Sequence, residues 1–278
     1  MAANLVKGGH EVFLFDVDVP RAAAVAAEIG AAPLEYLPGV AVAEIIVTML
    51  PDGHAVRAVS LGEDGIASVA RPGTVVIDMS SSQPMVTRDT GAALALRGIT
   101  LIDAPVSGGV AKAITGTLTI MIGGDDASAL AKAKPVLACL GTTFFEVGGL
   151  GSGHAAKALN NVVAAANYAV LSEALLTAER YGIEPAMFVD IVSASTGQSF
   201  LSSVVMKNFV LTKKFNTGFS VGLLAKDAAI AAELCKDLGF DAPHIQLASQ
   251  RWAQARDALG AGEDNSRAIS VWRDTGSD

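Results

Sequence analysis

Residues that bind metal ions or form disulfides are scarce in this sequence. Four histidines and two cysteines, Cys139 and Cys235, are scattered over 278 residues. No two histidines stand three or four residues apart, the spacing that lets one helix face hold a metal ion, so we expect no metal site. Both cysteines lie in apolar helical patterns, which is typical of buried free thiols. We therefore expect a protein of a reducing compartment, the cytoplasm.

Charge is also sparse, and its balance is acidic. Only 17% of residues are charged and the net charge is −8, which argues against a nucleic-acid surface because phosphate binding needs concentrated Lys and Arg. The hydrophobic fraction of 51% indicates a deep core rather than a membrane span. The most apolar long stretch, residues 155–178, still contains one lysine, one glutamate and three asparagines, whereas a span needs about 20 nearly uncharged residues. The N-terminus lacks the basic and apolar regions of a signal peptide.

Short apolar runs alternate with helical patterns in the first half of the chain. Runs that are apolar throughout are typical of strands buried on both faces of a sheet. Strands are predicted at 11–15, 45–50, 74–79, 99–102 and 117–122, and helices at 21–29 and 84–96. This alternation predicts βαβ units and a parallel, helix-covered sheet, that is, an α/β fold of the doubly wound Rossmann type.

The second half of the chain shows helical patterns only. These lie at 152–181, 185–193, 200–210, 219–238 and 243–259, with a short final turn at 268–272. The change of character coincides with the glycine-rich segment 148–153. We therefore expect two domains, a nucleotide-binding domain at 1–149 and an all-α domain at 150–278, entered by a long helix at about 152–181.

One part of the expected nucleotide-binding domain is not found in the sequence. Such a domain opens with a strand and a G-x-G-x-x-G turn, and an acid that bonds the ribose hydroxyls follows about 20 residues later. Here residues 1–7 resemble the back half of a helix ended by Gly8 and Gly9, and the next strand ends in Asp16. If Asp16 is that acid, the first strand and the glycine turn lie before Met1. An acid at this place repels a 2′-phosphate and favours NAD over NADP, although Arg21 is close.

A turn rich in small residues follows the strand predicted at 99–102. It reads Asp103-Ala-Pro-Val-Ser-Gly-Gly109, at a strand end where ligands bind in such sheets. The hydroxyl of Ser107 and the backbone N–H groups of Gly108 and Gly109 suit a carboxylate. A tight turn without a ligand would use the same residues.

A lysine and an asparagine share one face of the long predicted helix. Lys157 and Asn161 are four residues apart, and the rest of that face is small and apolar. A lysine buried there loses hydration, which favours its neutral form and lets it exchange a proton with a carbonyl or hydroxyl oxygen. The alternative is an ordinary solvated lysine.

Together these motifs resemble the 3-hydroxyisobutyrate dehydrogenase family of β-hydroxyacid dehydrogenases. Residues 103–109 are similar to its substrate-binding motif, and residues 148–160 match its G-x-x-G-x-G-x-x-x-K-x-x-N signature. Thr48-Met-Leu-Pro51 and Asp78-Met-Ser-Ser81 resemble its cofactor-side loops, and residues 219–227 resemble its F-x-x-x-L-x-x-K-D element. The resemblance spans essentially the whole chain and implies a helical C-terminal domain of the 6-phosphogluconate dehydrogenase type.

The resemblance implies a role for each motif. Lys157 would be the general acid/base, and Asn161 would lie near the substrate hydroxyl. The substrate carboxylate would bind to Ser107, Gly108 and Gly109. The residues implied in cofactor binding are Asp16, Met49, Leu50, Pro51, Ser81, Phe219, Lys226 and Asp227. Without the family pattern, Lys226 and Asp227 would be interpreted as a solvated helix face.

The predicted function is an NAD(P)-dependent oxidoreductase that interconverts a short 3-hydroxy acid and its semialdehyde, with NAD favoured. Candidate substrates are 3-hydroxyisobutyrate, tartronate semialdehyde and threonate. The apolar helical half and the family habit imply a homodimer or homotetramer. One alternative is a truncated dimeric remnant with weak or no activity. A second, an imine reductase-like relative, is disfavoured because Lys157 stands where those proteins usually carry a different acid.

Overall fold

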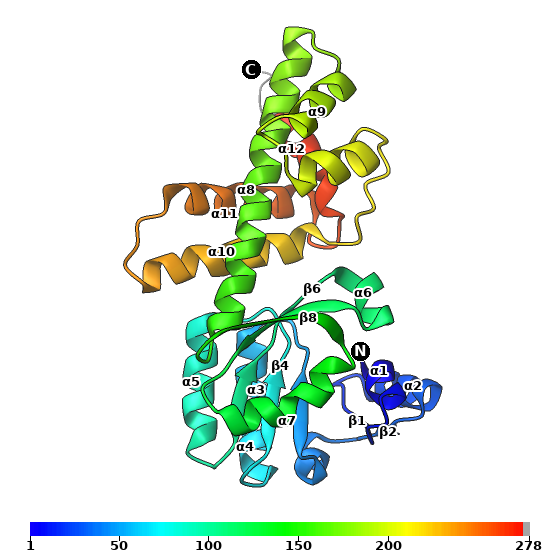
Figure 1. The fold of residues 1–278 in the computed structure, drawn as a ribbon, viewed down its shortest axis with the longest axis vertical. Coiled ribbons are helices and arrows are strands. Elements are labelled where there is room, and N and C mark those ends of the chain that lie inside the picture. The colour runs from blue at the N-terminus through cyan, green and yellow to red at the C-terminus, as the bar shows by residue number, and fades with distance from the viewer. Residues whose placement is uncertain (275–278) are drawn as a thin grey trace. The chain divides into compact units, whose positions relative to one another are not determined.

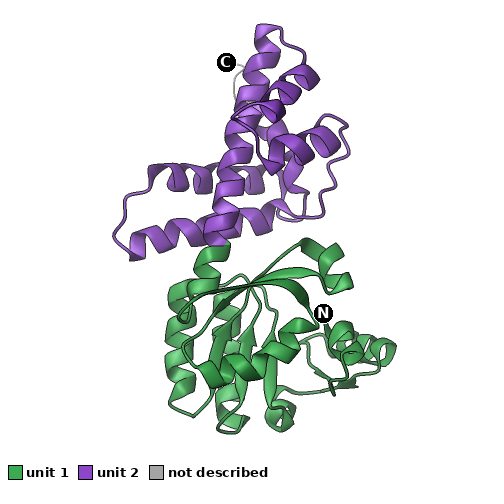
Figure 2. Cartoon of the chain, in the orientation of Figure 1, with its two compact units in different colours: residues 1–157 green, residues 158–278 purple. Residues whose placement is uncertain are grey.

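The chain forms two compact units, each with its own hydrophobic core (Figure 2). The computed structural model describes residues 1–274. The units comprise residues 1–157 and 158–278. The division between them lies within the long helix α8 (Ser152–Tyr181), a few residues after the glycine-rich segment at which the sequence changes character.

A six-stranded sheet forms the centre of the first unit (Figure 1). Its strands are β3 (Ile45–Thr48), β4 (Val75–Asp78), β5 (Thr100–Asp103), β6 (Val106–Ser107), β7 (Leu118–Gly123) and β8 (Gly141–Gly148). Strands β3, β4 and β5 are parallel, and their register places Thr48 beside Asp78 and Asp78 beside Asp103.

The sheet is mixed, which corrects the prediction of a parallel sheet. β7 runs antiparallel to β5 and β6 and parallel to β8. Between β5 and β7 the chain holds only the two-residue β6 and the short helix α6 (Gly109–Thr115). This link is not the long helical crossover that usually joins parallel strands, so β7 returns in the opposite direction.

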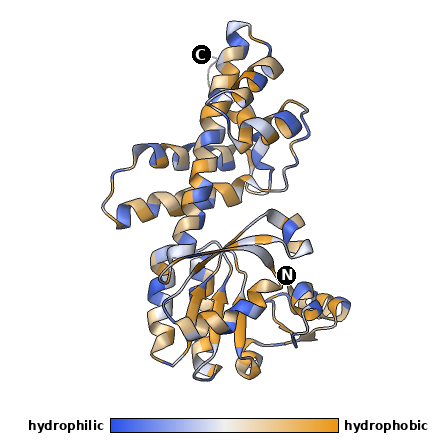
Figure 3. Ribbon diagram, in the orientation of Figure 1, coloured by the Kyte–Doolittle hydropathy of each residue, from blue (hydrophilic) through white to orange (hydrophobic). Residues whose placement is uncertain are grey.

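Both faces of this sheet are buried at β4, where every residue is buried. Val75 and Ile77 of β4 belong to one apolar cluster and Val76 to another, because successive side chains of a strand point to opposite faces. The neighbouring strands β3 and β4 are accordingly coloured mostly as hydrophobic in Figure 3. The helices of this unit outside α8 are α1 (Ala2–Lys7), α2 (Val19–Ile29), α3 (Gly53–Leu61), α4 (Ile66–Val69), α5 (Pro84–Ala95), α6 and α7 (Ala127–Ala138), with a 3₁₀ segment at Leu37–Val42.

A second, two-stranded sheet holds β1 (Phe13–Leu14) and β2 (Ala32–Pro33) in parallel. β1 and β3 therefore belong to different sheets, and in the described part of the chain each pairs with a single neighbour. In the common order of a doubly wound sheet, the strand that carries the glycine turn stands between the strands that correspond to these two.

The second unit is built from helices. Besides the greater part of α8 it contains α9 (Pro185–Ala194), a π-helix (Leu201–Val210), α10 (Val221–Asp237), α11 (Pro243–Leu259), a 3₁₀ turn (Asn265–Arg267) and α12 (Ala268–Asp274). The helix predicted at 200–210 is thus present with the wider π winding. Strands are absent from residues 158–274, apart from one isolated bridge between Ser220 and Asp264.

Three aromatic rings fix the end of the chain in the core of the second unit. Tyr168 of α8, Trp252 of α11 and Trp272 of α12 have ring centroids 5.6 to 6.0 Å apart. The Trp252 Nε1 donates to the Ala165 carbonyl and the Tyr168 hydroxyl donates to the Ser266 carbonyl. Burial raises the pKa of the Tyr168 hydroxyl above its ordinary value, so this ring stays neutral. The final turn predicted at 268–272 is therefore a docked helix.

Candidate active site

Predicted site residues of the first unit gather at the carboxyl ends of parallel strands. Met49, Leu50 and Pro51 follow β3, and Ser81 lies in the turn after β4. The Leu50 N–H donates to the Ser80 hydroxyl at 2.9 Å, which joins the two turns. Met49 and Pro51 are exposed, and Leu50 and Ser81 are half-buried. These residues thus lie at the carboxyl ends of the strands, where ligands bind in open α/β folds.

The predicted carboxylate-binding turn, residues 103–109, begins at the carboxyl end of β5, next to β4. Ser107 is half-buried in β6 and pairs with Thr119 of β7, while Gly108 and Gly109 are exposed. The two glycines have φ angles of 134° and 65°, a region that disfavours any side chain. The backbone can therefore approach a ligand closely at these positions.

Lys157 lies in the second turn of α8 and is only 9% exposed. It is therefore not the solvated lysine considered as an alternative from the sequence. Burial of an ammonium group costs free energy, so such a lysine is commonly held in place for a chemical purpose.

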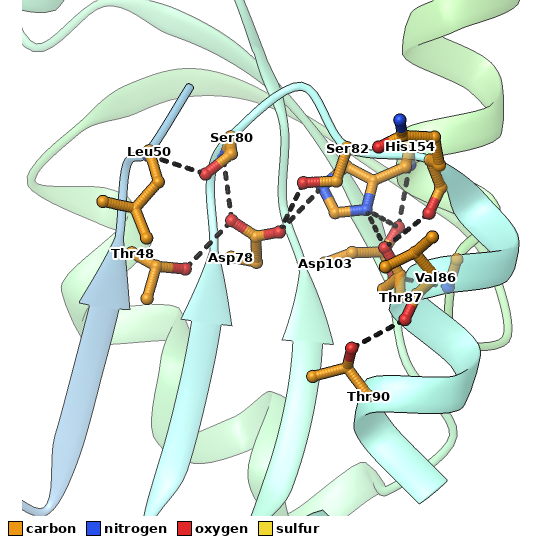
Figure 4. Close-up of polar contacts among 12 residues, drawn as sticks. Thr48, Leu50, Asp78, Ser80, Ser82, Val86, Thr87, Thr90, Asp103 and His154 are labelled. Carbon is orange, nitrogen blue, oxygen red and sulfur yellow. Dashed lines mark hydrogen bonds and ion pairs between the residues drawn. The ribbon is translucent and has the colours of Figure 1, made fainter. Parts of the chain in front are cut away.

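Two buried aspartates end neighbouring strands, and a buried histidine lies between them (Figure 4). Asp78 is the last residue of β4, Asp103 is the last residue of β5, and His154 lies in the first turn of α8. All three residues stand within motifs that the sequence analysis quoted, but none of them was predicted as a site residue. The available signal was the acid that ends each of the two apolar runs, Val-Val-Ile-Asp78 and Leu-Ile-Asp103.

The Asp103 carboxylate holds the start of α8. Its two oxygens accept from the backbone N–H groups of Gly151 and His154, each at 2.8 Å. A Cβ added to Gly153 would clash with the Met121 carbonyl of β7 and lie 2.8 Å from Asp103 Oδ2, so this glycine of the family signature lets the start of α8 approach both β7 and the carboxylate. The glycine-rich lead-in is therefore explained by a close approach of strand and helix.

The Asp78 carboxylate organises the turn that contains Ser81. Its Oδ1 accepts from the Thr48 hydroxyl at 2.9 Å and from the Ser80 N–H at 3.0 Å, and its Oδ2 accepts from the Ser82 hydroxyl at 2.8 Å. The residues on both sides of Ser81 are thus bound to one buried carboxylate.

The second unit brings two predicted site residues together. The Asn161 side-chain amide of α8 donates to Asp227 Oδ2 of α10 at 2.6 Å. Asp227 is 3% exposed, so the solvated helix face considered as an alternative is wrong for this residue. Lys226 is half-buried, and Phe219 lies just before Ser220, the N-cap of α10.

Asp16 lies two residues after β1 and is half-buried. Its Oδ1 accepts from the Asp18 N–H at 2.9 Å, and Asp18 in turn caps α2 by accepting from the Arg21 N–H. A carboxylate held at the end of a strand by its own turn fits the acid that accepts from ribose hydroxyls.

Two further findings concern the described residues as a whole. Within residues 1–274, no group of three or more His, Cys, Asp or Glu side chains is arranged to hold a metal ion. Every helix of the described chain is too short or too polar to cross a bilayer.

Known proteins match the chain over almost its whole length. Residues 1–149 match the family described as the NAD binding domain of 6-phosphogluconate dehydrogenase. Residues 151–272 match the family described as NAD-binding of NADP-dependent 3-hydroxyisobutyrate dehydrogenase.

Individual relatives agree with these family matches. The chain is 39% identical to a 2-(hydroxymethyl)glutarate dehydrogenase of Eubacterium barkeri, covering 98% of this chain and 90% of that one. It is 36% identical to a 3-hydroxyisobutyrate dehydrogenase of Pseudomonas aeruginosa, covering 98% and 94%. A solved structure of a Mycobacterium tuberculosis 3-hydroxyisobutyrate dehydrogenase with L-serine superimposes with a TM-score of 0.89 at 34% identity, covering 98% and 94%.

Proposed function

Because the chain belongs to the 3-hydroxyisobutyrate dehydrogenase family, whose members bind NAD(P), we propose that it interconverts a short 3-hydroxy acid and its semialdehyde. The observation that carries this proposal is the buried Lys157, placed in a helix whose start is bound to the strand that leads into Ser107. The proposed proton-transferring group and the proposed carboxylate-binding turn thus belong to one compact unit.

Each predicted residue has a task in this reaction. Ser107 and the backbone of Gly108 and Gly109 bind the substrate carboxylate. In the oxidative direction the neutral amine of Lys157 takes the proton of the substrate hydroxyl, and in the reductive direction its ammonium returns that proton to the carbonyl oxygen. NAD(P), when bound, takes up or supplies the hydride.

Asn161 lies one helical turn after Lys157 and orients the same substrate oxygen in this proposal. Its hydrogen bond to the buried Asp227 fixes the amide in one position. The contributions of Phe219, Lys226 and Asp227 to cofactor binding are part of the same proposal, as are those of Met49, Leu50, Pro51 and Ser81.

We propose NAD rather than NADP as the preferred cofactor. The support is the Asp16 carboxylate at the end of β1, which accepts from a ribose 2′-hydroxyl and repels a 2′-phosphate. Arg21 is exposed, and its backbone N–H serves the cap of α2.

A homodimer or homotetramer is also proposed. Leu159, Val163 and Val170 are exposed apolar side chains on α8, and their spacing of four and seven residues places them along one stripe. Sedimentation velocity on the wild-type protein measures the oligomeric state, and a monomer would contradict this part.

The test is steady-state kinetics with a panel of short 3-hydroxy acids and semialdehydes. The wild type is expected to turn over at least one of them with a higher kcat/KM for NAD than for NADP. Lys157→Met is expected to lower kcat about 10²- to 10⁴-fold because the proton donor is lost. Lys236→Met, the same change at an exposed position of α10, is expected to keep wild-type kcat.

Two outcomes would contradict the proposal. Substantial turnover by Lys157→Met would show that Lys157 is not the general acid/base. Absence of turnover with every compound and both cofactors favours the inactive remnant instead. Circular dichroism of each variant checks that the fold is retained.

A further inference from the structure

Three polar residues form a row across the carboxyl ends of β3, β4 and β5. Thr48, Asp78 and Asp103 are each the last residue of their strand and stand side by side in the register. All three are buried. Burying a carboxylate costs free energy unless hydrogen bonds compensate the loss of water. The hydrogen-bond partners of Asp78 and Asp103 therefore show which segments this row holds in place.

One end of the row holds the helix that carries Lys157. Asp103 accepts from the N–H groups of Gly151 and His154, which belong to the otherwise unsatisfied donors at a helix start. A helix start is commonly capped by its own neighbouring residue, but here the acceptor comes from a strand 48 residues earlier. Lys157 follows His154 by three residues, less than one helical turn.

The middle of the row holds the turn that carries Ser81. Asp78 binds Ser80 and Ser82 on either side of it, and Ser80 binds the Leu50 N–H of the next turn. The two turns proposed to contact the cofactor are thus both connected to this carboxylate.

The His154 side chain lies between the two halves. Its Nδ1 is hydrogen-bonded to the Thr87 hydroxyl of α5 at 2.9 Å and lies 3.8 Å from Asp103 Oδ2. Its Nε2 lies 3.5 Å from Asp78 Oδ2 and has no hydrogen-bond partner among the described residues. Figure 4 shows the imidazole between the two carboxylates, with Thr87 beside it. The ring is buried, and the three residues are not arranged as a metal site in the described chain.

We propose that the Asp78–His154–Asp103 network is a positioning device for the reaction. It connects the cofactor-side turns to the start of α8, so that the Lys157 amine and Ser81 keep a fixed spacing during hydride and proton transfer. The network includes none of the residues proposed to contact the substrate or the cofactor, and it acts through the residues that it holds. This inference rests on the proposed function.

Two threonines of α5 supply a matched test. Thr87 and Thr90 are both buried, and the hydroxyl of each is bonded to the carbonyl four residues earlier, Gln83 and Val86 respectively. Only Thr87 also contacts His154. Thr87→Val and Thr90→Val therefore remove the same group from the same helix, and only the first one alters the network. Substitution of Asp103 is a harsher variant that risks the fold, because two buried N–H groups would lose their acceptor.

The expected kinetic result separates positioning from stability. Thr87→Val should lower kcat about tenfold or more, because small misplacement of reacting groups is costly, with KM for the cofactor within about twofold. Its primary deuterium isotope effect on kcat should rise as hydride transfer becomes slower. Thr90→Val should keep wild-type kcat and isotope effect, although both variants lose some thermal stability.

A second measurement does not depend on turnover. Hydrogen exchange of the peptide that contains residues 150–157 should be at least about tenfold faster in Thr87→Val than in the wild type or Thr90→Val, since those amides are held by the network. Equal behaviour of the two variants in exchange and in kcat would overturn the inference. If the wild type shows no dehydrogenase activity, the proposed function fails, and the exchange rates still decide whether the network holds the helix start.

Discussion

At the scale of single residues, burial decides which of several chemically similar side chains can take part in the site. Asn161 and Asn167 lie on the same helix, but Asn161 is buried and donates to the Asp227 carboxylate at 2.6 Å, whereas Asn167 is exposed. The spacing of Lys157 and Asn161 predicted a shared face. It did not predict that Asp227, on another helix, faces the asparagine.

The same substitution at these two asparagines should have very different effects. Asn161→Asp places two buried carboxylates against each other, and we expect it to lower the free energy of unfolding by about 3 kcal/mol or more and to reduce activity. Asn167→Asp should change stability by less than about 0.5 kcal/mol, as is usual for surface changes. Urea denaturation at neutral pH measures both. Equal stabilities would show that Asn161 and Asp227 are not in contact in solution.

At the scale of elements, a helix or strand could be predicted from the sequence where its buried residues form a clear apolar pattern, and not where that pattern is weak. β4 is buried at every position and was expected from its apolar run. β8 was not expected, because only Gly141 of its eight residues is buried and its exposed residues include Thr, Glu and Phe. α12 was expected as a short docked turn and is a helix. Its docking depends on Trp272, which is 4% exposed and packs on aromatic rings from distant parts of the sequence.

The docking of α12 should contribute strongly to the stability of the second unit. Trp272→Ala removes a buried ring from the aromatic cluster, and we expect a loss of about 3–5 kcal/mol of unfolding free energy. Leu238→Ala, which truncates a largely exposed apolar side chain in the same unit, should cost less than about 1 kcal/mol. Chemical denaturation followed by far-ultraviolet circular dichroism makes the comparison. A Trp272→Ala loss as small as that of Leu238→Ala would contradict the docked position.

At the scale of the whole molecule, the two cores are chemically distinguishable. The first unit is centred on the sheet, with Ile77 fully buried in β4. The second is centred on the helical cluster that contains Trp252 and Trp272, the two tryptophans of the sequence. Tryptophan fluorescence therefore reports on the second unit, whereas circular dichroism reports on both.

A core substitution in one unit should leave the other unit's transition in place. Ile77→Ala is expected to lower the stability of the first unit by about 2–5 kcal/mol and to shift the dichroism transition toward lower denaturant. The fluorescence transition should keep its wild-type midpoint. Leu96→Ala, an exposed position in the same unit, should shift neither signal. Fluorescence and dichroism midpoints that move together in Ile77→Ala would show that the units unfold as one.

The sequence by itself determined the class of fold, the order of most elements and the motifs around Ser107, Lys157 and Asp227. It could do so because periodicity and local spacing are properties of neighbouring residues. Only the tertiary structure decided that Asp78, Asp103 and His154 meet at the carboxyl ends of adjacent strands, and that β7 runs against β5. Contacts between residues so far apart in the chain depend on strand register and on the space left by Gly153, and no local pattern encodes either of them.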